Sequence, residues 1–159
     1  MKQAKIIIYA VGLLLAFTST SNGQGKTVKV LGEVSTVIEH AVQKEMPGWN
    51  RRRAQPITGN LLGEVYNSND VNIKLSVISY ESSKEAAKQF KEGFSWDQSK
   101  QKVDYLGEEG YEWGYRGASF AFKINNLGVF VSITAGDMAG KEEISKRFAK
   151  IAYNALKDY

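Results

Sequence analysis

Alternation of apolar and mostly polar residues within residues 111–135 constrains the fold of this chain more than any other feature. Alternation with a period of two is typical of strands that bury one face. Apart from Ile124, large aromatic side chains occupy the apolar positions of the first two stretches, and valine and isoleucine occupy those of the third. The alternating stretches are residues 111–116, 119–124 and 129–134. They predict a three-stranded antiparallel meander with one aromatic-rich, apolar face.

Turn lengths set the register expected for this meander. A two-residue turn at residues 116–117 would place Tyr111 opposite Phe122. A four-residue loop at residues 125–128 would place Ile124 opposite Val129 and Phe122 opposite Val131. Both registers put the apolar sets on one face, and a one-residue slip at either turn would break that agreement.

Helical periodicity appears in three other segments. Residues 33–46 carry one apolar stripe, and Pro47 ends the helix that this stripe predicts. Ser82 and Glu85 form a capping box that predicts a second helix start. Residues 139–157 predict a third amphipathic helix. The stripe of the first helix consists of Val34, Val37, Ile38, Ala41 and Val42, and His40, the single histidine, lies beside it.

Two further strands are expected between the first two helices. Residues 61–66 and 71–80 flank a cluster of turn-forming residues at 67–70, which is typical of a hairpin. Residues 51–60 are expected to form a loop because they contain Pro56 and Gly59. The chain is therefore predicted to be α+β, with a mainly antiparallel sheet of about five strands and three packed helices in the order α-β-β-α-β-β-β-α. The sequence does not decide whether the helices cover one face of the sheet or both, but the polar opposite face of the meander favours one.

The N-terminus has the three parts of a secretory signal peptide. Lys2 and Lys5 precede an apolar run over residues 6–17, and small polar residues follow. The run is shorter than the roughly 20 residues that a membrane-spanning helix needs. We expect a signal peptide at residues 1–23, with cleavage after Ser21 or after Gly23, and an exported protein that is periplasmic or extracellular with no membrane span.

Residues 24–159 are expected to form a single domain. The chain has no cysteine, so core burial must stabilise this domain without disulfides, and it cannot carry the lipid of a bacterial lipoprotein. Removal of Lys2 and Lys5 leaves 19 basic against 17 acidic residues, a net charge of about +2. This charge is too low for the basic surface of a nucleic-acid-binding protein.

Most catalytic motifs are absent from the sequence. Without cysteine and with one histidine, the chain lacks the residues of a Cys–His nucleophile pair and of a zinc site. It contains no phosphate-binding glycine motif. We therefore expect no catalytic residue, no metal and no cofactor. The alternative is a small hydrolase that uses carboxylates; the candidates are Asp104, Glu108, Glu109 and Glu112.

A binding hypothesis concerns one basic cluster and two aromatic residues. A solvated loop is the simplest interpretation of the three consecutive arginines, and a patch for an anionic polymer, a lipid headgroup or an acidic partner is the alternative. Aromatic side chains outside the meander's apolar set could stack on a ligand. The candidate binding residues are Trp49, Arg51, Arg52, Arg53 and Phe130.

Residues 106–111 (Leu-Gly-Glu-Glu-Gly-Tyr), together with residues 120–126 and 129–133, resemble a pattern found in small exported α+β domains. The order of helices and strands is similar to the Mog1/PsbP-like group, which includes mycobacterial LpqN-type envelope proteins. This resemblance covers the C-terminal half and implies a non-enzymatic binding or assembly module. The chain departs from the pattern at Gly110, where alanine is expected, and lacks the lipid-bearing cysteine.

These features together predict an exported, non-enzymatic binding or assembly module of the bacterial cell envelope. Its expected partner is an unidentified envelope protein or polymer. A subunit that only associates with copies of itself is a third interpretation, and the sequence distinguishes neither the partner nor the oligomeric state.

Overall fold

The computed structural model describes residues 21–54, 57–93, 100–107, 109–114, 118–135 and 140–159; of residues 21–29, Arg53, Ala54 and Ala135 it describes only the backbone. Helices and strands follow one another as α1 (Ser21–Glu45), β1 (Asn50–Ala54), β2 (Leu61–Ser68), β3 (Val71–Ser79), α2 (Ser83–Gly93), β4 (Gln101–Lys102), the 3-10 helix η1 (Asp104–Leu106), β5 (Gly110–Trp113), β6 (Ser119–Ile124), β7 (Leu127–Ala135) and α3 (Glu142–Leu156). The α+β class and the three helices are confirmed.

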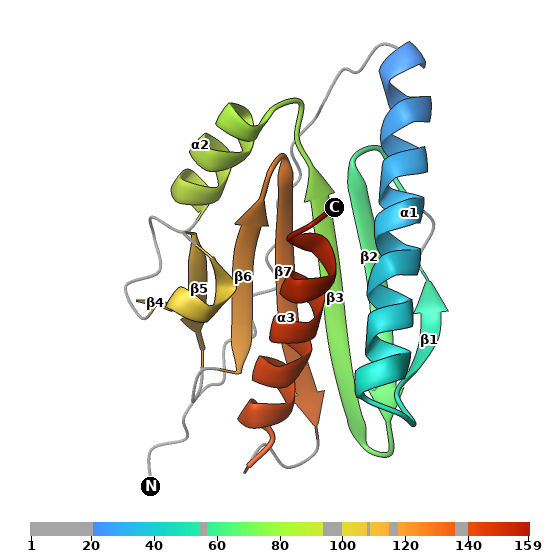
Figure 1. Ribbon diagram of the computed structural model, residues 1–159, viewed down its shortest axis with the longest axis vertical. Helices are drawn as coiled ribbons and strands as arrows, with labels where there is room; N and C mark the ends of the chain where they lie inside the picture. Colours follow the sequence, from blue (N-terminus) through green and yellow to red (C-terminus); the bar gives the residue numbers. More distant parts are fainter. Residues whose placement is uncertain (1–20, 55–56, 94–99, 108, 115–117, 136–139) are drawn as a thin grey trace, which may run out of the picture.

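All strands of the described chain belong to one sheet. Its order is β1-β2-β3-β7-β6-β5-β4, and neighbouring strands are antiparallel. The sheet therefore has seven strands rather than the five expected. Figure 1 shows α1 and α3 lying side by side across one face of the sheet and running in opposite directions. We call this the helix face, and the opposite side the far face.

The main core lies between the helix face and these two helices. The predicted stripe of α1 is confirmed, since Val34, Ile38 and Val42 are buried and His40 is exposed. Each large apolar side chain buried here contributes about 1.5–3 kcal/mol, which stabilises the domain without disulfides. The sheet contributes alternate residues, including Leu62, Tyr66, Ile73, Leu75, Val77, Phe120, Phe122, Val129 and Val131, and α3 contributes Phe148, Ile151, Ala152 and Leu156.

Polar contacts join α1 to α3 at both ends. Arg147 of α3 donates a hydrogen bond to the carbonyl oxygen of Glu45 at the end of α1. Tyr159, just beyond α3, donates to a carboxylate oxygen of Glu33 over 2.7 Å. These bonds fix how far one helix can slide along the other.

The expected register between β5 and β6 is wrong by one residue. Tyr111 pairs with Ala121, and Gly110 pairs with Phe122. Tyr111 and Trp113 therefore lie on the far face rather than the helix face. The reason is that η1 already covers this part of the helix face, where Leu106 is fully buried. Tyr115 and the expected turn at residues 116–117 lie outside the described residues.

A second apolar cluster on the far face receives these aromatic side chains. Phe90 of α2 lies 6.0 Å from Tyr111 and 5.8 Å from Phe130 between ring centroids. Ala121 is buried beneath Phe90, and Trp113 packs at the edge of the cluster. Because α2 covers part of the far face, helices lie on both faces of the sheet, a point that the sequence left open although the polar face of the meander favoured one face.

The β6–β7 connection is shorter than expected. Ile124 pairs with Leu127 across a two-residue turn, and Phe122 pairs with Val129. Asn125 adopts the left-handed conformation there, with φ of 50°, which asparagine tolerates better than most residues. The expected pair of Phe122 and Val131 is therefore wrong by two residues, because residues 127–128 belong to the strand rather than to a loop. A shift of two residues still leaves Val129 and Val131 on the same face as Phe120 and Phe122.

Two short strands were not expected. Residues 50–54 form the edge strand β1 rather than the start of a loop, with a bulge between Arg51 and Arg53. Residues 101–102 form β4 at the other edge, where they pair with β5. The predicted β2–β3 hairpin is confirmed, and its turn places Asn69 at a φ of 53°.

Close packing of η1 explains why position 110 is a glycine, where the resemblance described above leads one to expect alanine. An added Cβ would lie 2.6 Å from the Cβ of Leu106 and 2.9 Å from the carbonyl oxygen of Val103. Both atoms belong to the η1 segment that covers β5. This departure from the expected alanine therefore permits η1 to pack directly on the strand.

We predict that Gly110→Ala lowers the free energy of unfolding by about 1–3 kcal/mol, because overpacking must displace η1. Gly32→Ala in α1 is the matched control, since no atom lies within 4 Å of its added Cβ. That change should raise the free energy of unfolding by about 0.5–1 kcal/mol. Urea unfolding of both variants measures the difference, and equal stability of Gly110→Ala and the parent protein would contradict the packing described.

Candidate functional site

The most deeply buried carboxylate among the described residues is Glu64, in the middle of β2. Its side chain has 0% exposure. The alternation of β2 directs Leu62, Glu64 and Tyr66 toward the helix face, so that a charged group enters the apolar core. A buried carboxylate without partners is strongly unfavourable, and its surroundings must compensate for the lost water.

Three side chains from three elements bind this carboxylate. Ser35 of α1 donates a short hydrogen bond to Oε1 of Glu64. Arg51 of β1 donates to the same oxygen over 3.0 Å and to Ser35 over 2.7 Å. Tyr66 donates to Oε2 over 2.9 Å. Both carboxylate oxygens therefore have partners, and the cluster joins α1 to β1 and β2.

Arg51 also forms an ion pair with Glu39 of α1, at 2.9 Å. Burial of the guanidinium lowers its pKa, but the hydrogen bond and charge of Glu64 outweigh this, so the pKa of Arg51 is raised. Burial and the charge of Glu64 raise the pKa of Tyr66 far above its usual range. The arginine therefore stays charged and the phenol stays neutral, and each remains a donor to Glu64.

The five binding residues expected from the sequence are not gathered into one site. Arg51 belongs to the buried cluster around Glu64, whereas its neighbour Arg52 is exposed. Trp49 is half-buried against the main core. Phe130 lies on the far face beside Phe90. The side chain of Arg53 lies outside the described residues.

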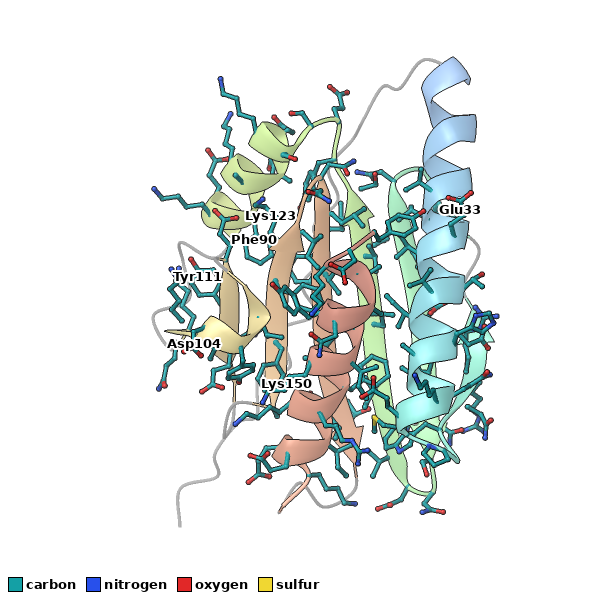
Figure 2. All side chains as sticks on the ribbon, in the orientation of Figure 1. Glu33, Phe90, Asp104, Tyr111, Lys123 and Lys150 are labelled. Carbon is teal, nitrogen blue, oxygen red and sulfur yellow. The ribbon has the colours of Figure 1, made fainter. Side chains whose placement is uncertain are left out.

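The carboxylates considered for hydrolysis contact different groups and do not form one cluster in the part of the chain that the structure describes. Glu112 accepts a hydrogen bond from Tyr105 over 3.1 Å. Lys146 and Lys150 of α3 lie over the ring of that tyrosine, at 5.2 and 4.5 Å from its centroid. Asp104 is exposed, and Figure 2 shows it beside η1 on the side of the molecule that also carries Lys150. Glu108 lies outside the described residues.

Glu109 lies instead at a cavity of about 290 Å³ near the end of β6. The cavity is bounded by α2, the loop before β5, the end of β6 and the last turn of α3. Figure 2 shows Lys123 at this end of the sheet, next to α2. Its lining residues are Ala87, Gly107, Glu109, Lys123, Ile124, Tyr153 and Lys157.

Two close contacts hold Tyr153 at this cavity. Its ring meets that of Phe122 edge-on, with centroids 5.6 Å apart and an angle of 89°. Gly107 approaches from the other side, and a Cβ there would lie 2.8 Å from the phenolic oxygen. Gly107 also has a φ of 80°, which other residues rarely adopt. A glycine is thus required for both the turn and the contact.

Charge at the cavity is mixed. Oε2 of Glu109 is buried and has no hydrogen-bond partner among the residues that the structure describes. The nearest cation is Lys123, whose Nζ lies 3.8 Å from that oxygen and 3.4 Å from the carbonyl oxygen of Asn125. Lys157 is exposed at the rim. The cavity therefore offers cationic donors and one carboxylate that has an ion-pair partner but leaves an oxygen without a hydrogen bond.

A second hollow, of about 480 Å³, lies between α1 and the C-terminal residue. Glu33, Val37 and Tyr159 line it, and the hydrogen bond from Tyr159 to Glu33 occupies its polar groups. Its lining offers fewer charged groups than the cavity at β6.

Neither a metal site nor a membrane-spanning helix is found in the described ranges. No group of three or more histidine, aspartate or glutamate side chains comes close enough there to hold a metal ion. None of the helices in that part of the chain combines the length and apolar character needed to cross a bilayer. Comparison with protein-family models, curated proteins and solved structures gives no match for this chain.

We predict that Arg51→Ala lowers the free energy of unfolding by about 3 kcal/mol, because it leaves the carboxylate of Glu64 buried without a compensating charge. Arg52→Ala removes the same charge from the adjacent exposed position and should change stability by less than about 0.5 kcal/mol. Urea unfolding at neutral pH measures both values. Equal effects of the two variants would show that Arg51 has no structural role beyond its surface charge.

Alkaline pH should destabilise the protein partly through Tyr66. Its pKa in the folded state is raised above the unfolded value of about 10, so its contribution is complete below about pH 10 and is lost as pH rises further. Tyr66→Phe should lose stability less steeply between about pH 8 and pH 11, although it starts lower because a hydrogen bond to Glu64 is absent. Urea midpoints across this range measure the slopes, and parallel slopes would contradict the prediction.

Proposed function

We propose that this chain is an exported, non-enzymatic binding module of the bacterial cell envelope. The observation that carries the proposal is the cavity at the end of β6, where Lys123, Lys157 and Glu109 line an open space. Ligand sites are typically concave, with a few polar groups that fix orientation. Phe122 and Gly107 pack on both sides of Tyr153, which fixes the position of this side chain at the cavity.

The buried cluster around Glu64 supports a structural role for the other ionisable groups. Its carboxylate is enclosed and bound by Ser35, Arg51 and Tyr66, so a substrate would have to break these contacts to reach it. Because the cluster joins α1 to the sheet, we infer that it maintains the fold rather than performing chemistry.

The alternative function is a small hydrolase with a carboxylate pair. Glycoside hydrolysis needs two carboxyl groups that flank one bond. Glu109 faces Lys123, whereas Glu112 is bonded to Tyr105. Because these two carboxylates engage different partners, we favour binding over hydrolysis.

The proposal of export is based on the N-terminal sequence. Cleavage after Ser21 or Gly23 would leave α1 starting at Asn22 or Gln24. Either product would retain the residues of α1 that are buried in the described structure, which begin at Leu31. The proposed processing is therefore compatible with the same core.

We predict that the tagged protein is recovered from the envelope or medium of its source with a mass that starts at Asn22 or Gln24. Affinity capture from a crosslinked extract, read by mass spectrometry, should enrich one protein or glycan. The double variant Lys123→Gln/Lys157→Gln should lose this enrichment, whereas Arg52→Ala should retain it. An unprocessed protein that stays inside the cell would contradict export, and an empty capture followed by activity in a hydrolase screen would favour the enzyme.

A further inference from the structure

The cavity at the end of β6 has a lining that suits a small ligand with two kinds of polar group. Lys123 and Lys157 come from different elements and both line the same space. Ammonium groups are donors without acceptor capacity, so their natural ligand group is an anionic oxygen. They therefore favour a carboxylate or a phosphate in the ligand.

Glu109 imposes the second requirement. Its buried Oε2 lacks a hydrogen-bond partner within the described part of the chain, and such an atom is costly to leave unsatisfied. The ammonium of Lys123, at 3.8 Å, is too far for a hydrogen bond. The Glu109 side chain as a whole is 35% exposed, so a ligand O–H or N–H donor can reach its carboxylate, whereas a simple anion would be repelled by it.

The end of α3 points to the same conclusion. Tyr153 belongs to its last turn and Lys157 caps it, with the backbone N–H of Lys157 donating to the carbonyl oxygen of Tyr153. The C-terminus of a helix carries partial negative charge. This charge disfavours a bare anion near α3 and favours a donor, and the hydroxyl of Tyr153 can both donate and accept.

The size of the cavity limits the ligand. Its volume is about 290 Å³, and a water molecule occupies about 30 Å³ of liquid. The space therefore holds a ligand of about ten non-hydrogen atoms, or one residue of a longer polymer. Ala87 and Ile124 supply apolar walls that can contact a short carbon skeleton.

We propose that this cavity binds a small hydroxylated anion, that is, a polyol or sugar unit that carries a phosphate or a carboxylate. This inference rests on the proposed binding function and names the chemistry of its ligand. Lys123 and Lys157 bind the anionic oxygens, Glu109 accepts a hydrogen bond from a ligand hydroxyl, and Tyr153 orients the ligand between them.

Isothermal titration of the protein purified after export tests this proposal. The probes are glycerol 3-phosphate, which carries hydroxyls and a phosphate, and glucuronate, which carries hydroxyls and a carboxylate. Glycerol, acetate and inorganic phosphate serve as the single-function controls. At least one of the two complete probes should bind at least ten-fold more tightly than every control, and the one preferred identifies the anionic group.

Matched variants locate the binding. Lys123→Gln and Glu109→Gln should each weaken binding of the preferred probe by at least ten-fold, and Glu109→Gln should also reduce its advantage over inorganic phosphate or acetate. Lys102→Gln removes one charge from an exposed residue of β4, and this variant should bind the probe as the parent protein does. Circular dichroism confirms folding, and Lys157→Gln replaces Lys123→Gln if the latter does not fold.

Three results would overturn the proposal. They are no binding of either complete probe, equal affinity for a complete probe and its single-function control, and equal loss with Lys102→Gln and Lys123→Gln. If the probes fail while envelope capture still enriches a partner, only the ligand chemistry is wrong. If both fail, the proposed binding function is wrong as well.

Discussion

The N-terminal half of this fold depends on one buried charge, the carboxylate of Glu64. Its side chain is fully enclosed between α1 and β2, where the loss of water costs several kcal/mol. Arg51 supplies the opposite charge from β1, and Ser35 supplies a hydroxyl from α1. Because all three must meet, the position of the edge strand and the docking of α1 are set by the same group.

This arrangement separates structural chemistry from chemistry that is free to bind. The groups around Glu64 bind one another. Burial raises the pKa of Tyr66, so its phenol stays protonated and donates to Glu64. At the end of β6, by contrast, Lys123 and Lys157 line an open cavity, and one oxygen of Glu109 has no hydrogen-bond partner among the described residues. The second group is therefore the better candidate for contact with another molecule.

Local patterns in the sequence predict the elements well, but not which face each strand presents. The stripe of α1 and the β2–β3 hairpin were predictable because both depend on neighbours in the sequence. The face of the sheet on which Tyr111 lies was not predictable, because alternation shows only that Tyr111 and Glu112 point to opposite faces. Its actual cover is Phe90 of α2, while Leu106 of η1 takes the helix face. Leu106 comes from a segment without a strong pattern, and the capping box of α2 predicts where that helix starts but not which face of the sheet it covers.

The missed strand β1 left a signal in the sequence. Glu64 stands at an inward position of an alternating strand, between Leu62 and Tyr66, and an acid there requires a basic partner. The nearby arginines are the obvious source, although nothing in their order selects Arg51 over Arg52. The cavity left less of a signal, because Gly107, Lys123 and Tyr153 come from separate elements and share no motif. Among its lining residues, only Glu109 was a candidate functional residue from the sequence, and there it was considered as an acid for hydrolysis.

A double-mutant cycle on Arg51 and Glu64 tests most directly whether this buried pair organises the fold. The proteins are the parent, Arg51→Met, Glu64→Leu and the double variant, with free energies of unfolding from urea titration. We expect Arg51→Met to be the most destabilised, by about 3 kcal/mol, since it leaves a buried carboxylate uncompensated. The double variant should recover at least about 1 kcal/mol relative to the sum of the single effects. Additive losses would mean that the two charges do not depend on each other and would contradict the account.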